Sequence, residues 1–291
     1  MGKNRNWTSL FREKIFPLLK APQTLLLLLT GLAGYMTARC PILDLPLLLG
    51  AAGSLFLAIS GSTVLNMWYD RDIDAQMGRT CERPLASRQM LPEAGLRFGL
   101  IISILGIGWA LFLDPLFGLL VFGGLFFDVV IYTMWLKRRT AWAILWGGIS
   151  GGMPVLAGRA LGMGRVDWIG ICLALAILFW IPTHILTISI RYHEEYLTAG
   201  IPTFPSEYGF KRTRQVIAFS SILAALAMGL SAFGVGLSPG LLGILAFLSL
   251  LLFTFAVNSL ARPSEKATFN LFKFASLYMM AAMLILIIGV S

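Results

Sequence analysis

Long apolar stretches separated by short polar breaks recur from one end of the chain to the other. A helix of about 20 apolar residues crosses a hydrocarbon core of about 30 Å, and nine stretches of roughly that length are present. They occupy residues 23–43, 46–66, 95–113, 115–135, 141–161, 167–190, 214–235, 238–260 and 269–290. Backbone groups in lipid must be hydrogen-bonded within their own segment, and these runs lack the alternation of a barrel strand. The sequence therefore predicts an all-α integral membrane protein with about nine transmembrane helices.

Composition excludes an ordinary soluble protein. Hydrophobic residues make up 57% of the 291 residues, charged residues only 13%, and the mean hydropathy is +0.80. These values lie far outside the range of soluble domains. The sequence contains no visible internal repeat, nucleotide-binding loop or soluble domain. We therefore divide the chain into a basic cytosolic N-terminal tail at 1–22 and one membrane domain at 23–291.

Basic residues indicate how the chain crosses the membrane, because cytosolic loops retain Lys and Arg. With an odd number of spans and a cytosolic N-terminus, all of the 23 Lys and Arg residues except Arg39, Arg159 and Arg165 fall on the cytosolic side. The C-terminus is then outside. This asymmetry and attraction to anionic lipid account for the net charge of +9, so we expect membrane lipid, and no nucleic acid, as a partner. We expect a multi-pass protein of the inner (cytoplasmic) membrane.

The first cluster of polar residues follows the second apolar stretch. Asn66, Asp70 and Asp74 are spaced four residues apart, which places them on one face of a helix. Like charges at this spacing repel each other, so a cation is expected among them. Oxygen ligands of this kind suit Mg²⁺, which fills its remaining positions with water and phosphate oxygens. The alternative is a solvated loop in which the aspartates pair with neighbouring arginines: Arg71, Arg79 and Arg83.

The second polar cluster follows the sixth stretch. Glu194 and Glu195 come directly after it, where they could bind a second metal ion or orient water on the first. Arg191 and Lys211 could neutralise a departing diphosphate. The alternative is that these side chains only solvate an interfacial loop.

Several motifs in this order carry a family resemblance. Asn66–Asp74 has the spacing Asn-x-x-x-Asp-x-x-x-Asp, and Arg-Pro-Leu at 83–85, Tyr-Thr-Met-Trp-Leu-Lys-Arg-Arg-Thr at 132–140, a glycine-rich segment at 147–154 and the segment 196–205 follow. Together they resemble the intramembrane prenyltransferases of the UbiA superfamily, most closely the protoheme IX farnesyltransferase (heme O synthase) branch. The resemblance extends over residues 20 to 290.

The resemblance implies a fold and a reaction. The helices would surround a central cavity open to the cytosol, where Asn66, Asp70 and Asp74 bind Mg²⁺ and the diphosphate of farnesyl diphosphate. Glu194 and Glu195 would assist the metal. In the heme branch, a vinyl group of protoheme IX (heme b) attacks the farnesyl cation and water adds, which gives heme O.

Departure of diphosphate from an allylic carbon creates a cation and an anion, and the site must stabilise both. We expect Asp70, Asp74 and His184 to be catalytic, His184 by ligating heme iron or acting on a proton, although it could equally be a packing residue. The candidate diphosphate-binding residues are Asn66, Arg79, Lys137, Arg138, Arg191 and Lys211. The candidate walls of the acceptor and prenyl pocket are Trp68, Tyr69, Asp128, Tyr132, Trp135 and His184. Tryptophan and tyrosine also collect at membrane interfaces, which is the alternative for those rings.

The chain also departs from the heme branch. Ala143, Arg159 and Ile185 replace an asparagine, a tryptophan and a phenylalanine that are usual there, and Asp128 replaces a residue that is more often aromatic. Two alternatives therefore stay open: prenylation of an aromatic quinone precursor or another lipid acceptor, and transport of small anions. A transporter would place charged or broken helices near the midplane, whereas here the acids gather at helix ends.

Overall fold

The computed structural model describes residues 16–39 and 44–290, and within those ranges every regular element is helical. The first half contains η2 (Phe16–Leu19), α2 (Ala21–Arg39), α3 (Leu45–Tyr69), α4 (Arg71–Asp74), α5 (Pro92–Leu113), α6 (Pro115–Leu125) and the π-helix η3 (Phe126–Leu136). The second half contains α7 (Ala143–Met163), α8 (Trp168–Arg191), α9 (His193–Thr198), α10 (Phe204–Val235), α11 (Pro239–Ala261) and α12 (Glu265–Val290). Each predicted stretch falls on one helix or, for 115–135, on α6 and η3 together, while residues 40–43 of the first stretch and 1–15 of the predicted tail lie outside the described residues.

The helices begin where a side chain can bond the first free backbone N–H groups. Asp44, Asp114 and Asp167 accept hydrogen bonds at the starts of α3, α6 and α8. α10 begins ten residues before the predicted 214, because Thr203 forms a capping box with Ser206. A kink at Gly209, with φ of 76°, then redirects the helix.

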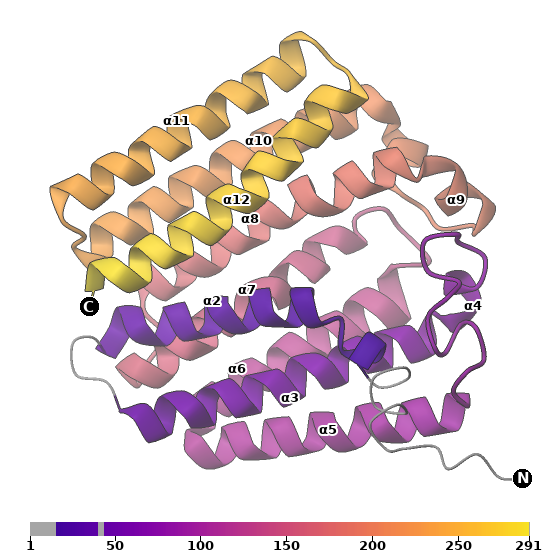
Figure 1. The fold of residues 1–291 in the computed structure, drawn as a ribbon, viewed down its shortest axis with the longest axis horizontal. Coiled ribbons are helices and arrows are strands. Elements are labelled where there is room, and N and C mark those ends of the chain that lie inside the picture. Colours follow the sequence, from indigo (N-terminus) through magenta and orange to yellow (C-terminus); the bar gives the residue numbers. More distant parts are fainter. Residues whose placement is uncertain (1–15, 40–43, 291) are drawn as a thin grey trace, which may run out of the picture.

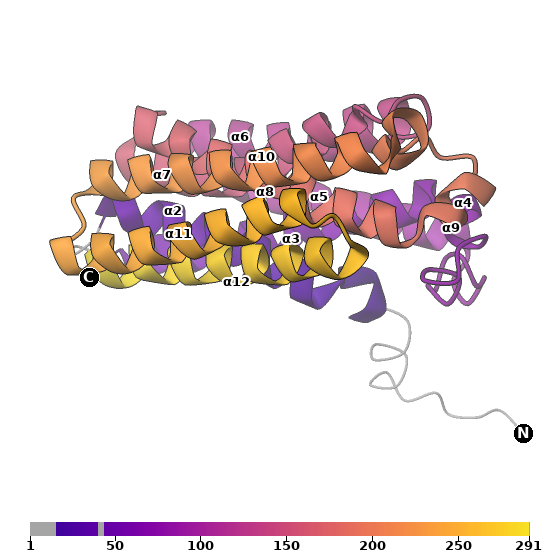
Figure 2. The same ribbon diagram turned by 90° about the horizontal axis from the view of Figure 1, so that it is seen from above.

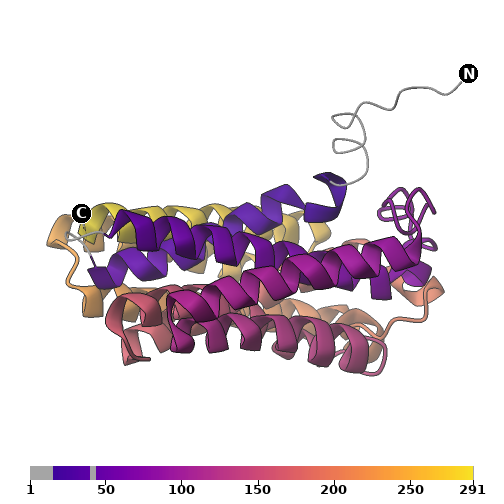
Figure 3. The same ribbon diagram turned by 90° about the horizontal axis from the view of Figure 1, so that it is seen from below.

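The helices run along one another as a bundle whose two ends differ (Figure 1). α3 packs along α5, α8 along α10, and α2 along α7. Turned by 90°, the bundle has α6, α7 and α10 on one side and α2, α11 and α12 on the other (Figure 2), while α3 and α5 cross together on the face seen from below (Figure 3). Figure 1 shows α4 and α9, far apart in sequence, at the same end of the bundle.

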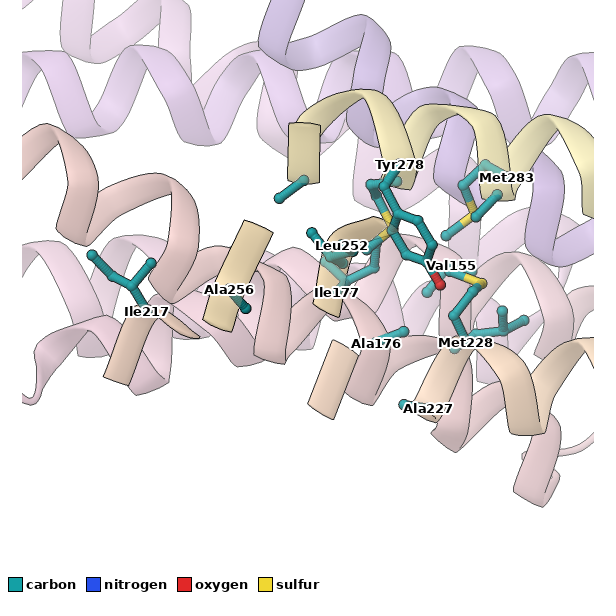
Figure 4. Close-up of a cluster of buried hydrophobic side chains, with 14 of the residues drawn as sticks. Val155, Ala176, Ile177, Ile217, Ala227, Met228, Leu252, Ala256, Tyr278 and Met283 are labelled. Carbon is teal, nitrogen blue, oxygen red and sulfur yellow. The ribbon is translucent and has the colours of Figure 1, made fainter. Parts of the chain in front are cut away.

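α7 connects the two halves of the bundle. Its Val155 belongs to a core shared with α8 and α10 to α12, in which Met228, Leu252 and Tyr278 are buried (Figure 4). On its other side α7 meets α2 backbone to backbone: a Cβ built on Gly158 would lie 1.9 Å from the carbonyl oxygen of Gly31. Small residues permit this approach, as in other helix pairs within membranes.

Seven helical segments are long and apolar enough to cross a membrane: α3, α5, α6 with η3, α8, α10, α11 and α12. Their outward faces are apolar, with Phe112 87% and Phe233 74% exposed, so this is a multi-pass membrane protein. α2 and α7 are less apolar because they contain more glycine and polar residues, and Gly31, Gly34 and Gly158 are the glycines that lie where these two helices meet. The span count of nine and the sidedness of the termini stay predictions.

Candidate active site

A cavity of about 660 Å³ extends inward from the end of the bundle that holds α4. That volume lies in the range of small-molecule sites. The ionisable side chains that line its mouth among the described residues are Lys20, Asp70, Asp74, Arg79, Arg83 and Lys137. Deeper walls include Leu26, Leu55, Ile59, Val121, Ile181 and Leu186. The cavity therefore joins a charged mouth to an apolar interior.

Two aspartates at the mouth lie one helical turn apart. Asp70 caps α3 and Asp74 ends α4, and the Asp74 N–H donates to the Asp70 carbonyl oxygen at 2.8 Å. Lys137 donates to Asp70 Oδ2, and Arg83 Nη1 donates to Asp74 Oδ2 at 2.7 Å. The Asp70 Oδ1 atom is buried and accepts no hydrogen bond from the described residues. Its nearest cationic partner there is Arg138 Nη2 at 3.8 Å, so this oxygen has an ion-pair contact but unused hydrogen-bonding capacity.

Burial and pairing oppose each other at Asp70 and Lys137. Burial raises the pKa of the Asp70 carboxyl, and the charge of Lys137 only partly counteracts it. Burial also disfavours the charge of Lys137, but Asp70 and Tyr132 outweigh that effect and raise the pKa of the ammonium group. Lys137 is therefore charged at neutral pH and available to a phosphate oxygen.

Asn66 is turned toward a third acid. Its Nδ2 donates to Asp128 Oδ2 at 2.7 Å, and its Oδ1 accepts from the Thr133 hydroxyl at 2.9 Å. Ser62 donates to the same Asp128 oxygen at 2.5 Å. Both ends of the Asn66 amide are therefore engaged with η3, and the sequence pattern contained no signal for these partners.

The π-helix explains how η3 presents its polar residues to one space. Asp128 and Lys137 both line the cavity although nine residues separate them. In an α-helix of 3.6 residues per turn, nine residues make two and a half turns and would face opposite ways. The Lys137 N–H instead donates to the Tyr132 carbonyl, five residues back, and this wider turn brings nine residues close to two full turns.

Two more cations reach the mouth. Lys20, which the sequence places in the N-terminal tail, lines the cavity, and its backbone φ is 41°. Burial, together with the charges of Arg83 and Lys137, lowers its pKa to about 8. Arg79 donates to the Tyr196 hydroxyl at 3.1 Å and also lines the cavity. The available signal for Lys20 was its position directly before the first apolar stretch.

His184 lies deeper in the same cavity. Its ring packs against Trp180 and Phe272, with centroids 5.3 and 5.0 Å away. Its Nδ1 is buried and has no hydrogen-bond partner among the described residues. The hydrogen-bonding and metal-ligating capacity of this nitrogen is thus unused within the described part of the chain.

Other predicted site residues lie outside the cavity lining. Glu194, Glu195 and Arg191 surround a separate hollow of about 320 Å³ beside α9. Arg191 stacks on Phe269 at 4.9 Å, and Lys211 is exposed on α10. The structure therefore does not bring the second polar cluster into the main cavity.

The predicted aromatic residues divide in the same way. Tyr132 lines the cavity, whereas Trp68, Tyr69 and Trp135 lie outside its lining, with Trp135 50% exposed. Arg138 stacks on Tyr69 at 4.8 Å and binds Asp72 at 2.7 Å. These side chains support the loops around the mouth.

The mouth fits a Mg²⁺ ion that shares its ligands with a substrate. Among the described residues no group of three or more His, Cys, Asp or Glu side chains is close enough to hold a metal ion alone. Asp70 and Asp74 nevertheless present hard oxygen atoms one turn apart, including the buried Oδ1 of Asp70. Mg²⁺ commonly takes one or two carboxylates and completes its shell with water and phosphate oxygens.

Comparisons with known proteins agree with this architecture. A family profile described as "UbiA prenyltransferase family" matches residues 27–278. The chain is 42% identical to the protoheme IX farnesyltransferase of Korarchaeum cryptofilum, over 73% of each chain. It is 38% identical to that of Archaeoglobus fulgidus, over 93% of this chain and 95% of the other.

Solved structures share the fold. A structure of digeranylgeranylglyceryl phosphate synthase superposes with a TM-score of 0.79 at 20% identity, covering 94% of this chain and 96% of the other. A UbiA homolog from Archaeoglobus fulgidus bound to DMAPP and Mg²⁺ superposes with a TM-score of 0.69 at 17% identity, covering 94% and 99%.

Proposed function

This chain belongs to the UbiA prenyltransferase family, and on that premise we propose that it transfers the farnesyl group of farnesyl diphosphate to a vinyl group of protoheme IX, converting heme b to heme O. The resemblance expected from the sequence motifs is thus confirmed, and the chain is a prenyltransferase. The observation that carries the proposal is a cavity with a charged mouth and an apolar interior, because farnesyl diphosphate has the same division.

The mouth binds the diphosphate. Asp70 and Asp74 would hold Mg²⁺, which when bound neutralises charge on the diphosphate. Lys137 and Arg83 already lie against these aspartates, and Lys20 and Arg79 complete a cationic rim. Cations aimed at the leaving group are worth more as its C–O bond breaks, because charge develops there.

The interior holds the farnesyl chain and excludes water from the allylic cation. Tyr132 and Trp180 present aromatic rings to this space, and each can stabilise a nearby cation by roughly 0.5–2 kcal/mol. The terminal carbon of the heme vinyl group then attacks C1 of the farnesyl group. The resulting cation on the carbon next to the pyrrole ring is captured by water, which gives a hydroxylated product.

His184 orients the heme. Its buried Nδ1 has no partner among the described residues, and neutral imidazole nitrogen is a common iron ligand. Trp180 and Phe272 fix the ring from two sides. Iron ligation there would place the edge of the porphyrin within the same cavity as the farnesyl chain.

The protein lies in the inner membrane with the mouth of the cavity on the cytosolic side. The N-terminus is on the same side, and the C-terminus is outside. This follows from the positive-inside rule, since the basic loops around α4 and α9 share one end of the bundle. Glu194, Glu195, Arg191 and Lys211 then form an outer approach to the mouth, where they would meet the diphosphate as it enters or leaves.

The test is turnover of purified protein in detergent with Mg²⁺ and farnesyl diphosphate, with heme b and a hydroxybenzoate offered in parallel and products identified by mass. Farnesylated, hydrated heme is expected, and chelation of Mg²⁺ should abolish it. Prenylated hydroxybenzoate alone would replace the heme acceptor by a quinone precursor. Uptake of a small anion into liposomes without any prenyl product would overturn the assignment as an enzyme.

A further inference from the structure

Asp128 is an acid inside a membrane-spanning segment, and the steps above leave it without a role. It is partly exposed and lines the cavity. Ser62 and Asn66 both donate to its Oδ2, at 2.5 and 2.7 Å. Its Oδ1 accepts no hydrogen bond from the described residues and stays open to the cavity. Intramembrane carboxylates are costly, which makes such a residue a candidate for function.

Asp128 lies further into the membrane than Asp70, at the level where the bond to the prenyl chain would form. Its partners Ser62 and Asn66 lie on α3, eight and four residues before Asp70. At 1.5 Å per residue this places them about 6–12 Å further into the membrane than the diphosphate end. Atoms at that level are those just beyond the leaving group, namely C1 of the prenyl chain and the acceptor carbons that approach it.

The two donors also set what Asp128 can do. Hydrogen bonds from Ser62 and Asn66 to Oδ2 fix the plane of the carboxylate. The free Oδ1 is then held toward the cavity as a hydrogen-bond acceptor. In a largely apolar interior, such an atom is a binding point for one water molecule.

Resting on the proposed function, we propose that Asp128 is the catalytic residue that holds and deprotonates the water which completes the product. The C1–O bond of farnesyl diphosphate breaks and its electron pair leaves with the diphosphate. The vinyl carbon forms a bond to C1, which leaves a cation on the carbon next to the ring. The oxygen of the water held by Asp128 Oδ1 bonds to that carbon, and its proton passes to the carboxylate. That proton later leaves through the mouth with the diphosphate.

A purely structural role makes a different prediction. If Asp128 only held Asn66 in place, its loss would weaken binding of the diphosphate and lower the amount of every product in parallel. As the base for water, its loss instead changes which product forms. Without capture by water, the cation loses a proton from the neighbouring carbon, and the product is an alkene one water molecule lighter than the hydroxylated heme.

The experiment compares Asp128→Asn, Asp128→Glu and Asp114→Asn with wild type in the heme b assay. Asp114→Asn is the matched control, because it makes the same change at the far end of the α6–η3 segment, where asparagine caps a helix as well as aspartate does. Both products are quantified by mass, the KM for farnesyl diphosphate is measured, and size-exclusion profiles confirm folding.

Asp128→Asn is expected to lower the rate of the hydroxylated product about 100-fold or more, the usual contribution of a general base. The lighter alkene should appear, the KM should hold, and Asp128→Glu should restore part of the hydroxylated product. An unchanged product ratio, or a parallel fall of both products with a raised KM, would overturn the role of Asp128. If Asp128→Asn fails to fold, an unchanged ratio in Asp128→Glu decides against it. Wild-type protein that makes no farnesylated heme would remove the proposed function itself.

Discussion

Acidic and basic side chains pair at both ends of the bundle, but at one end a carboxylate oxygen has no hydrogen bond from the described residues. At the far end, Arg159 binds Asp167 through two hydrogen bonds of 2.7 and 2.8 Å, and its remaining nitrogen donates to Thr37. At the α4 end, Asp70 keeps a buried oxygen without a hydrogen bond from the described residues, and a cavity opens beside it.

Both ends use charged residues, so residue type does not tell a structural ion pair from a functional site. The two differ in how many of their hydrogen-bonding atoms have a partner within the protein. Arg159, 4% exposed, joins α2, α7 and α8, and each of its three side-chain nitrogens donates a hydrogen bond within the protein. Asp70 and Asp128 both line the cavity, and each has a carboxylate oxygen that accepts no hydrogen bond from the described residues, so a substrate, water or ion can complete them. Charged side chains that line a cavity and have unused hydrogen-bonding atoms therefore mark the functional end.

The largest expected effect is on turnover at the open end. Asp70→Asn should lower kcat about 1,000-fold, because it removes a charge that acts on the leaving diphosphate through its bound metal. Asp74→Asn should behave alike. Product formation with saturating Mg²⁺ and farnesyl diphosphate measures the loss. Wild-type rates in either folded variant would remove the metal-site argument.

At the closed end, Arg159→Met should destabilise the protein by about 3–5 kcal/mol, because it leaves Asp167 facing an apolar partner. The double variant Arg159→Met with Asp167→Asn should recover most of this loss, since asparagine still caps α8. Unfolding in detergent measures both. Turnover per folded molecule should stay at the wild-type value, and a large fall in it would break the division between the two ends.

The backbone contact between α2 and α7 should show an intermediate effect. Gly158→Ala forces the helices apart, because its Cβ would lie 1.9 Å from the Gly31 carbonyl oxygen, and should cost about 1–3 kcal/mol. Gly123→Ala on α6 is the control, since nothing lies within 4 Å of its Cβ. Equal stability of the two variants would contradict the close approach.

The smallest effect is expected at an ion pair that is exposed at the open end. Asp72 binds Arg138 at 2.7 Å, but its side chain is 55% exposed. Asp72→Asn should change stability by less than about 1 kcal/mol and leave kcat within about threefold. The same assays measure it, so it also serves as the acidic control for Asp70→Asn. A large loss of activity would mean that position in the loop, not burial, decides function.

The sequence predicted the helical architecture well because burial in lipid dominates the free energy of those segments. Apolar length alone locates α3, α5, α11 and α12 within a few residues. The early start of α10 was missed, since it depends on a local capping box at Thr203 and Ser206. The π-helix was also missed, because a shift in hydrogen-bond partner leaves the apolar pattern unchanged.

The site was predicted less completely, for a tertiary reason. The four-residue spacing of Asn66, Asp70 and Asp74 is local, and it did place the two aspartates together at the cavity mouth. Which residues meet them depends on how separate helices pack. Lys20 and Ser62 reach the cavity from α2's start and from α3, while Glu194 turns to a different hollow. Single-sequence patterns contain no information on such meetings.

The wide turn of η3 makes this segment sensitive to length more than to composition. Removing one residue between Asp128 and Lys137 would restore ordinary helical phase and rotate one end relative to the other by about a quarter turn. The two side chains would then no longer point into the cavity together. Many substitutions along these residues preserve that phase, whereas a single insertion or deletion turns one end by about a quarter turn relative to the other. The number of residues between Asp128 and Lys137 is therefore more tightly constrained than their identity.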